Sequence, residues 1–145
     1  MPTPVVDLKA LSPLMEIVLR AGDVSIAGAR ESLQTAYAKR DPSYPDAVGL
    51  SVLFRRGATL DELAREGLFP HRKLSFSFIG PLIQALAVVG YEPILYVTPT
   101  PDLPDHHSLA VGRSEQAHPT LTDAAADALI RASTVVDNPY RQPNP

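Results

Sequence analysis

The chain has 145 residues, 45% of them hydrophobic, which is the common size of one domain and enough apolar material for a sizeable core. Its formal net charge of −3 argues against broad non-specific binding to nucleic acid or to an anionic membrane, because both partners favour a basic face. Cysteine is absent, which excludes disulfides, thiolate metal sites and a cysteine nucleophile, and suits a cytoplasmic location.

The N-terminal part of the chain predicts a strand, a helix and a second strand. The start, MPTPVVDLKALSPLMEIVLR, has no basic n-region and is interrupted by prolines and charges, so we expect neither a signal peptide nor a membrane span. A β-branched run predicts a strand over Leu14–Arg20, with a short helix as the alternative. The sequence VGLSVLF predicts a strand over Gly49–Phe54. Between them, apolar residues at spacings of three and four predict one helical face: Ile26, Ala29, Leu33, Ala36 and Tyr37.

The middle of the chain predicts one more helix and one more strand. Thr59 and Glu62 have the spacing of a capping box, and Gly67 follows as a stop signal. We therefore expect a short helix between Thr59 and Gly67. The sequence KLSFSF over Lys73–Phe78 alternates apolar residues with serines, which is the period of a half-buried strand.

The next segment predicts a buried helix followed by two strands. Pro81 suits a first helical turn, and the sequence up to Gly90 is apolar almost all round. Residues 91–98 read as a strand interrupted by Pro93, and a short strand is expected at Ser108–Val111.

The C-terminal part predicts a last helix and a tail. The sequence TLTDAAADALIRAS, residues 120–133, predicts a helix capped by Thr120 or Thr122. Taken together, these elements predict an α+β fold in which residues 1–137 form a single small domain. Its sheet should be mixed and mostly antiparallel, flanked by three to four short helices. Residues 138–145 should form a flexible, proline-rich tail.

The loop TPDLPDHHSLAV concentrates chemically useful side chains, namely Asp102, Asp105, His106 and His107. Imidazole titrates near neutral pH and a carboxylate can orient it, so the group suits acid–base chemistry or metal binding. If the chain is extended at His106 and His107, however, the two rings point to opposite faces and do not readily serve one centre. The loop is therefore either an exposed turn or the position of a catalytic or ligand-contacting histidine. A metal site is a third alternative, which we do not expect.

Two further groups are candidates for a binding site. Ser51 is the polar side chain in the otherwise apolar strand VGLSVLF, where it can hold a ligand or a neighbouring backbone group. The forked guanidinium group of arginine can bind phosphates, although such charges in loops are more commonly solvated and a surface salt bridge explains Arg20 equally well. The cationic candidates are Arg20, Arg55, Arg56, His71, Arg72 and Lys73.

Several nucleotide-binding and metal-binding motifs are absent from the sequence. It contains no G-x-x-x-x-G-K-[ST] loop, no G-x-G-x-x-G fingerprint and no H-E-x-x-H. These absences disfavour nucleotide hydrolases, standard dinucleotide oxidoreductases and common zinc enzymes.

The order GLSV, TLDELAREGL and GYEPILYVTPTPDLPDHHSLAV, within residues 48–111, resembles a layout of small bacterial proteins. It is similar to type VI secretion toxins with an ADP-ribosyltransferase-like fold, which pair a GxSV strand with a late His-Tyr-Thr-Ile segment. The resemblance implies that Ser51 lies on the sheet that floors a cleft, with His106 or His107 at its edge. It also makes Arg20 a further cleft residue.

The same resemblance implies binding of NAD as a substrate, attack on its ribose carbon with loss of nicotinamide, and a role related to toxins. Such enzymes present a late glutamate, for which Glu115 is the residue in a comparable place, and an aromatic platform, for which the candidates are Tyr91, Tyr96 and Phe76. One alternative is a non-enzymatic interaction protein with a partner of the toxin–antitoxin or immunity type. Another is a metal- or histidine-dependent hydrolase centred on Asp102, Asp105, His106 and His107.

Overall fold

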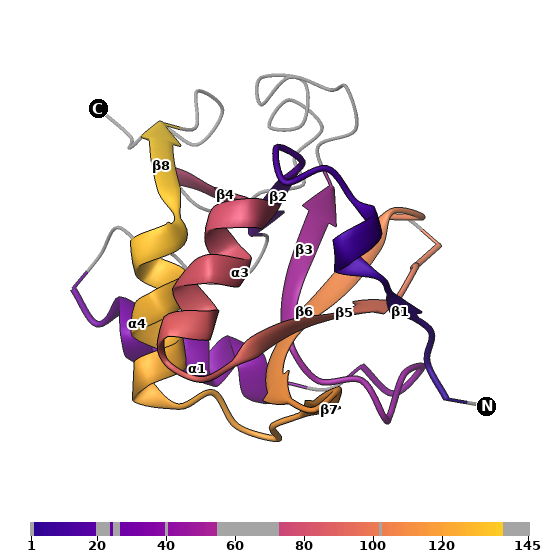
Figure 1. The fold of residues 1–145 in the computed structure, drawn as a ribbon. Coiled ribbons are helices and arrows are strands. Elements are labelled where there is room, and N and C mark those ends of the chain that lie inside the picture. The colour runs from indigo at the N-terminus through magenta and orange to yellow at the C-terminus, as the bar shows by residue number, and fades with distance from the viewer. Residues whose placement is uncertain are drawn as a thin grey trace.

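The computed structural model describes residues 2–19, 24, 27–39, 41–54, 73–101 and 103–137. Over these ranges the predicted α+β fold is confirmed, since an open antiparallel sheet is accompanied by three α-helices and one 3₁₀ helix (Figure 1). Among the helices in the described part of the chain, none is long and apolar enough to cross a membrane.

The sheet is built from eight described strands. In chain order they are β1 (Val5–Val6), β2 (Glu16–Leu19), β3 (Leu50–Phe54), β4 (Lys73–Phe78), β5 (Glu92–Val97), β6 (His106–Arg113), β7 (Gln116–Ala117) and β8 (Thr134–Asp137). Their spatial order is β1-β5-β6-β3-β2-β4-β8, with β7 paired to β6. Each of these pairings is antiparallel. The two strands that carry the GLSV and DHHSLAV motifs, β3 and β6, are therefore neighbours.

The helices are η1 (Leu8–Ala10), α1 (Ala29–Ala38), α3 (Ile79–Val88) and α4 (Asp123–Ala132). In Figure 1, α3 and α4 lie side by side in front of the sheet, and α1 packs against α4 and β3. The expected cap of α4 is present, because the Thr122 hydroxyl accepts a hydrogen bond from the Ala125 amide.

The sheet has two faces of different character. Successive side chains of a strand point to opposite faces, so Leu50, Val52 and Phe54 share one face while Ser51 and Leu53 share the other. The first face joins the buried apolar cluster that includes the inner residues of the three helices: Leu33, Tyr37, Leu82, Leu86, Ala125 and Leu129. The helices therefore cover the first face, and Ser51 belongs to the opposite one.

Two strands depart from the sequence prediction. Strand β6 begins at His106 rather than at Ser108, because both histidines pair with β3 and His107 also pairs with β5. The four-residue strand β8 at Thr134–Asp137 was not predicted, although the β-branched residues Thr134, Val135 and Val136 follow the last helix directly. The predicted helix at residues 59–67 and the predicted tail at 138–145 lie outside the described residues.

Pro93 does not interrupt its strand as the sequence suggested. It lies within β5 and is in register with Val111 of β6. Strand β1 pairs with Leu95 and Tyr96 of β5, and no described strand pairs with the outer side of β5 at Pro93, so this position is an edge of the described sheet. A missing backbone N–H is tolerated at such an edge.

Candidate functional site

Ser51 and His106 form a hydrogen-bonded pair on the sheet face opposite the helices. Ser51 Oγ lies 2.6 Å from His106 Nε2, and both side chains are partly exposed. The contact follows from the pairing of β3 with β6, in which Ser51 is opposite Ser108 and Leu53 is opposite His106. Ser51 and His106 are therefore diagonal neighbours on one face, within reach of a long side chain. Of the predicted site residues, the structure brings these two together.

Thr98 contacts Nδ1, the other ring nitrogen of His106. His106 Nδ1 lies 2.9 Å from the backbone oxygen of Thr98 and 3.0 Å from its hydroxyl. The same hydroxyl lies 3.0 Å from Ser108 Oγ, so Ser51, His106, Thr98 and Ser108 form one polar network. Thr98 is buried, with 2% of its surface exposed. We call these four residues the polar network.

The carbonyl contact determines which nitrogen of His106 carries the proton. A carbonyl oxygen can only accept a hydrogen bond, so Nδ1 must be the donor to Thr98. In the neutral ring Nε2 then carries the lone pair, which accepts the hydrogen bond of the Ser51 hydroxyl. A serine that donates to an imidazole oriented from its far side is the arrangement of a nucleophile and its general base.

His107 is buried in the core and is not part of the polar network. It is in register with Val52, whose face is covered by the helices, and only 5% of its surface is exposed. Its Nδ1 donates to the backbone oxygen of Asp105 at 2.7 Å, and its ring packs edge-on against Phe54 with centroids 4.7 Å apart. The expected separation of the two histidines onto opposite faces is therefore present. His106 is the one that faces Ser51.

Of the three candidate aromatic platforms, Tyr96 lies closest to the network in the sheet register. It is opposite Ser108 in the pairing of β5 with β6. Phe76 is opposite Val18, which is in turn opposite Leu53, so two strands separate Phe76 from His106. Tyr91 contacts His118 and lies under the guanidinium of Arg113, outside the polar network.

Glu115 is not placed to act with His106. Strand β6 runs from His106 to Arg113, so the turn that contains Glu115 lies beyond the opposite end of the strand. At about 3.4 Å per residue the strand separates its two ends by roughly 24 Å. The Glu115 amide instead donates to Glu92 Oε1. The late glutamate suggested by the resemblance is thus remote from the polar network.

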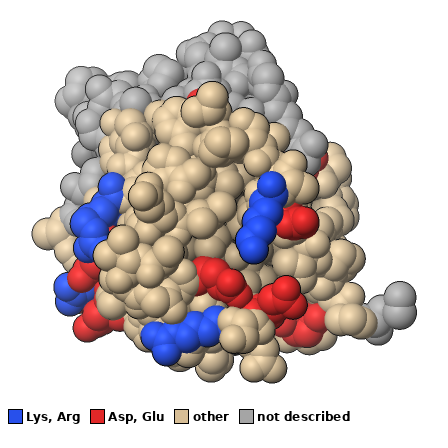
Figure 2. Space-filling view, in the orientation of Figure 1, with Lys and Arg blue, Asp and Glu red and all other residues tan. Residues whose placement is uncertain are grey.

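Several predicted residues lie outside the described part of the chain. These are the proposed phosphate-binding arginines Arg20, Arg55 and Arg72, and also Arg56, His71 and Asp102. Across residues 2–19, 24, 27–39, 41–54, 73–101 and 103–137, no group of three histidine, aspartate or glutamate side chains could hold a metal ion. Figure 2, seen from the side of α3 and α4, shows acidic and basic side chains interspersed.

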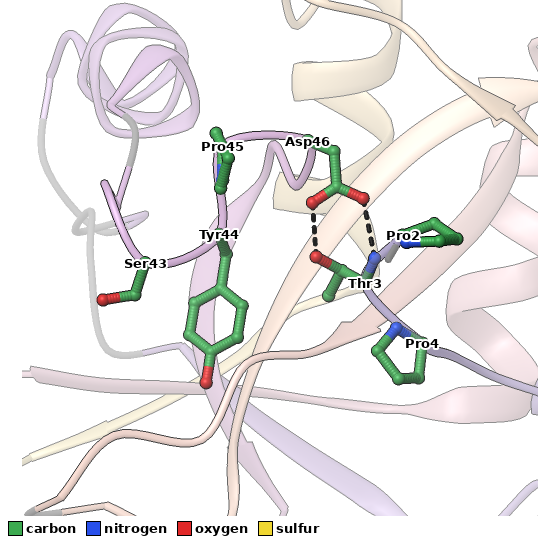
Figure 3. Close-up of a pocket in the computed structure, with 7 residues that line it drawn as sticks. All are labelled: Pro2, Thr3, Pro4, Ser43, Tyr44, Pro45 and Asp46. Atoms are coloured by element: carbon green, nitrogen blue, oxygen red, sulfur yellow. Dashed lines mark hydrogen bonds between the residues drawn. The ribbon is translucent and has the colours of Figure 1, made fainter.

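An open pocket of about 560 Å³ is formed by the N-terminal segment and the loop before β3. Its lining consists of Pro2, Thr3, Pro4, Ser43, Tyr44, Pro45 and Asp46 (Figure 3). Two hydrogen bonds connect it to the residues on either side of Thr98. The Pro4 backbone oxygen accepts from the Val97 amide, and the Tyr44 hydroxyl donates to the Pro99 backbone oxygen. The pocket therefore adjoins the strand end that carries the polar network.

Asp46 holds the two walls of this pocket together. Its carboxylate accepts from the Thr3 amide at 2.7 Å and from the Thr3 hydroxyl, as Figure 3 shows. These hydrogen bonds hold the pKa of Asp46 below its usual value. Partial burial, with a smaller contribution from the Asp46 charge, raises the pKa of Tyr96. Tyr96 is therefore neutral at physiological pH and available as a hydroxyl donor.

Thr98, Ser108 and the proline-lined pocket were missed by the sequence analysis. A signal existed for Ser108, because it is two residues after His106 in an extended segment and so shares its face. Thr98 and the pocket carried no such signal, since both depend on contacts between segments far apart in the chain. Comparison with protein-family models, curated proteins and solved structures finds no match, so function has to be inferred from the site itself.

Proposed function

We propose that the protein binds NAD on the sheet face that carries the polar network and acts as an ADP-ribosyltransferase-like protein related to toxins. The observation that carries the proposal is the 2.6 Å contact between Ser51 Oγ and His106 Nε2. These residues come from the two segments on which the resemblance to such toxins rests. Their contact supports the proposal, because the resemblance implies that Ser51 and one of the two histidines belong to one site.

The polar network would hold the nicotinamide ribose. Hydroxyl groups and an imidazole can both donate to and accept from ribose hydroxyls, and partly exposed Ser51, His106 and Ser108 offer such groups on one face. Tyr96, beside Ser108 in the sheet, would supply the aromatic surface for the nicotinamide ring.

The adjoining pocket would receive a base of the dinucleotide. Its volume is in the usual range for small-ligand sites, and proline and tyrosine rings give apolar surface for a planar group. The pyrophosphate would then need cationic partners, for which Arg20, Arg55 and Arg72 stay the candidates from the sequence.

The proposed chemistry is attack on the ribose carbon of NAD with departure of nicotinamide. The bond from that carbon to nicotinamide breaks first, and positive charge develops on the ribose. Oriented hydroxyl and imidazole dipoles around the ribose would stabilise that charge relative to water. An ADP-ribosyl acceptor, either water or a partner protein, then forms the new bond and loses a proton.

Calorimetric titration with NAD tests this proposal. Wild-type protein should bind NAD, and Ser51→Ala and His106→Ala should each weaken binding about 10-fold, the loss expected for one good hydrogen bond. His118→Ala is the matched control, because His118 packs on Tyr91 outside the polar network and should bind NAD like wild type. The proposal fails if wild-type protein shows no NAD binding. The interaction-protein alternative would then take its place.

A further inference from the structure

We infer that Ser51 is an activated nucleophile with His106 as its general base, and that the protein can transfer acyl groups from small neutral esters. This inference goes beyond NAD binding, because acyl transfer to a serine needs no nucleotide. It rests on the geometry of one pair and on the protonation state that the geometry imposes.

The first argument is the direction of the hydrogen bonds. The Thr98 carbonyl accepts from His106 Nδ1, which leaves Nε2 as the acceptor for the Ser51 proton. In serine hydrolases a carboxylate orients the far nitrogen of the histidine, and here the described acceptor at that nitrogen is a backbone carbonyl. Because Thr98 directly follows β5 while Ser51 belongs to β3, the pairing of both strands with β6 sets the ring orientation.

The second argument is accessibility. Ser51 and His106 are each partly exposed, whereas Thr98, which orients the ring, is buried. The pair is therefore in contact with solvent, while Thr98 is shielded from it. Buried orienting contacts of this kind keep a reactive side chain in one rotamer.

The third argument concerns the class of substrate. The described side chains in register with the pair include Val18, Leu53, Tyr96 and Ser108, which are uncharged, and Thr98, whose amide donates to the His106 backbone oxygen, is uncharged as well. Neutral, partly apolar surroundings favour an uncharged group at the reacting carbon, since a buried charge would lose hydration without a partner. Small carboxylic esters meet this requirement.

Ser51, His106, the ester and water supply every atom and proton that the reaction needs. Ser51 Oγ attacks the ester carbonyl carbon while its proton passes to His106 Nε2. The tetrahedral intermediate then expels the alcohol, which takes that proton, and an acyl-serine remains. Water attacks the acyl-serine with His106 again as base, which releases the carboxylic acid and restores the serine.

An alkyl fluorophosphonate is the probe for the nucleophile. In this reaction the serine oxygen bonds to phosphorus, the phosphorus–fluorine bond breaks and the proton goes to His106. Mass spectrometry of the wild-type protein should find one adduct, mapped to Ser51. Its rate of formation should rise with pH and level off once one imidazole has lost its proton. In His106→Gln the rate should fall at least 100-fold and the levelling-off should disappear.

The matched control is Ser32→Ala on α1, a serine with the same partial exposure but outside the sheet, which should label like wild type. Release of nitrophenolate from nitrophenyl butyrate should follow the same order among the variants. No adduct on Ser51 of the wild type, or an equal labelling rate in folded His106→Gln, overturns the inference. Labelling and NAD calorimetry are separate measurements, so either proposal can fail while the other stands.

Discussion

His106 and His107 are consecutive in the chain, but their imidazole rings lie on opposite faces of the sheet. Nε2 of His106 contacts Ser51 Oγ on one face, and the ring of His107 packs against Phe54 on the face covered by the helices. One histidine therefore belongs to the candidate site and the other to the core. The same substitution at the two histidines should therefore change the free energy of unfolding by different amounts.

Replacing His107 by alanine should lower the free energy of unfolding by about 2–3 kcal/mol, because it leaves a cavity beside Phe54 and removes the hydrogen bond to Asp105. The same change at partly exposed His106 should cost about 1 kcal/mol or less, since water can replace the lost contact. Urea denaturation followed by circular dichroism measures both values. Equal losses would contradict the assignment of the two rings to different environments.

The neutral ring of His106 should carry its proton on Nδ1. The reason is the Thr98 backbone oxygen 2.9 Å away, which can only accept. Nitrogen-15 NMR of histidine-labelled protein distinguishes the two tautomers, and His106→Gln assigns the resonances. Thr98→Val removes the hydroxyl but keeps the carbonyl, so the tautomer should be unchanged in that variant. A neutral ring protonated on Nε2 would remove the basis for a serine proton donated to His106.

Gly49 should be intolerant of a side chain. Its φ is +140°, and an added Cβ would lie 2.5 Å from the backbone carbon and oxygen of Leu109 in the neighbouring strand. Gly49→Ala should therefore destabilise the protein by at least about 2 kcal/mol, or prevent folding. Gly28→Ala is the control, because Gly28 also has a positive φ but an added Cβ comes no closer than 3.8 Å to Glu31. It should cost only about 1–2 kcal/mol of backbone strain, and a smaller loss at Gly49 than at Gly28 would contradict this account.

Asp127 should make the stability of the protein depend on acid pH. It accepts two hydrogen bonds from Arg30, at 3.0 and 2.9 Å, and these hold its pKa below the ordinary 3.8. A carboxyl with a lower pKa in the folded than in the unfolded chain stabilises the fold above its unfolded pKa. That stabilisation is lost as the pH falls through the folded pKa.

Asp127→Asn should therefore lose less stability than wild type when the pH is lowered from about 5 to about 2. Arg30→Met should flatten the profile in the same way, and the double variant should add little more. Thermal unfolding across this range measures the effect. If the profile of Asp127→Asn runs parallel to that of wild type, the ion pair between α1 and α4 does not contribute to acid stability.

Local patterns were enough to predict much of the fold. The alternation in KLSFSF, the capping threonine of the last helix and the apolar segment after Pro81 all became the expected elements. Local signals failed where a neighbouring strand decides the outcome. Pro93 is accommodated because β1 stops short of it, and His106 is in a strand because Leu53 of β3 pairs with it.

The sequence by itself determined that Ser51 lies in an apolar strand and that His106 and His107, if extended, point opposite ways, because strand geometry has a period of two. Only the tertiary structure decided which histidine meets Ser51. That choice depends on β3 pairing with β6 so that Leu53 is opposite His106. A shift of one residue would have placed the other histidine on the face of Ser51. Such a register is set by packing over the whole sheet, which no short segment of sequence contains.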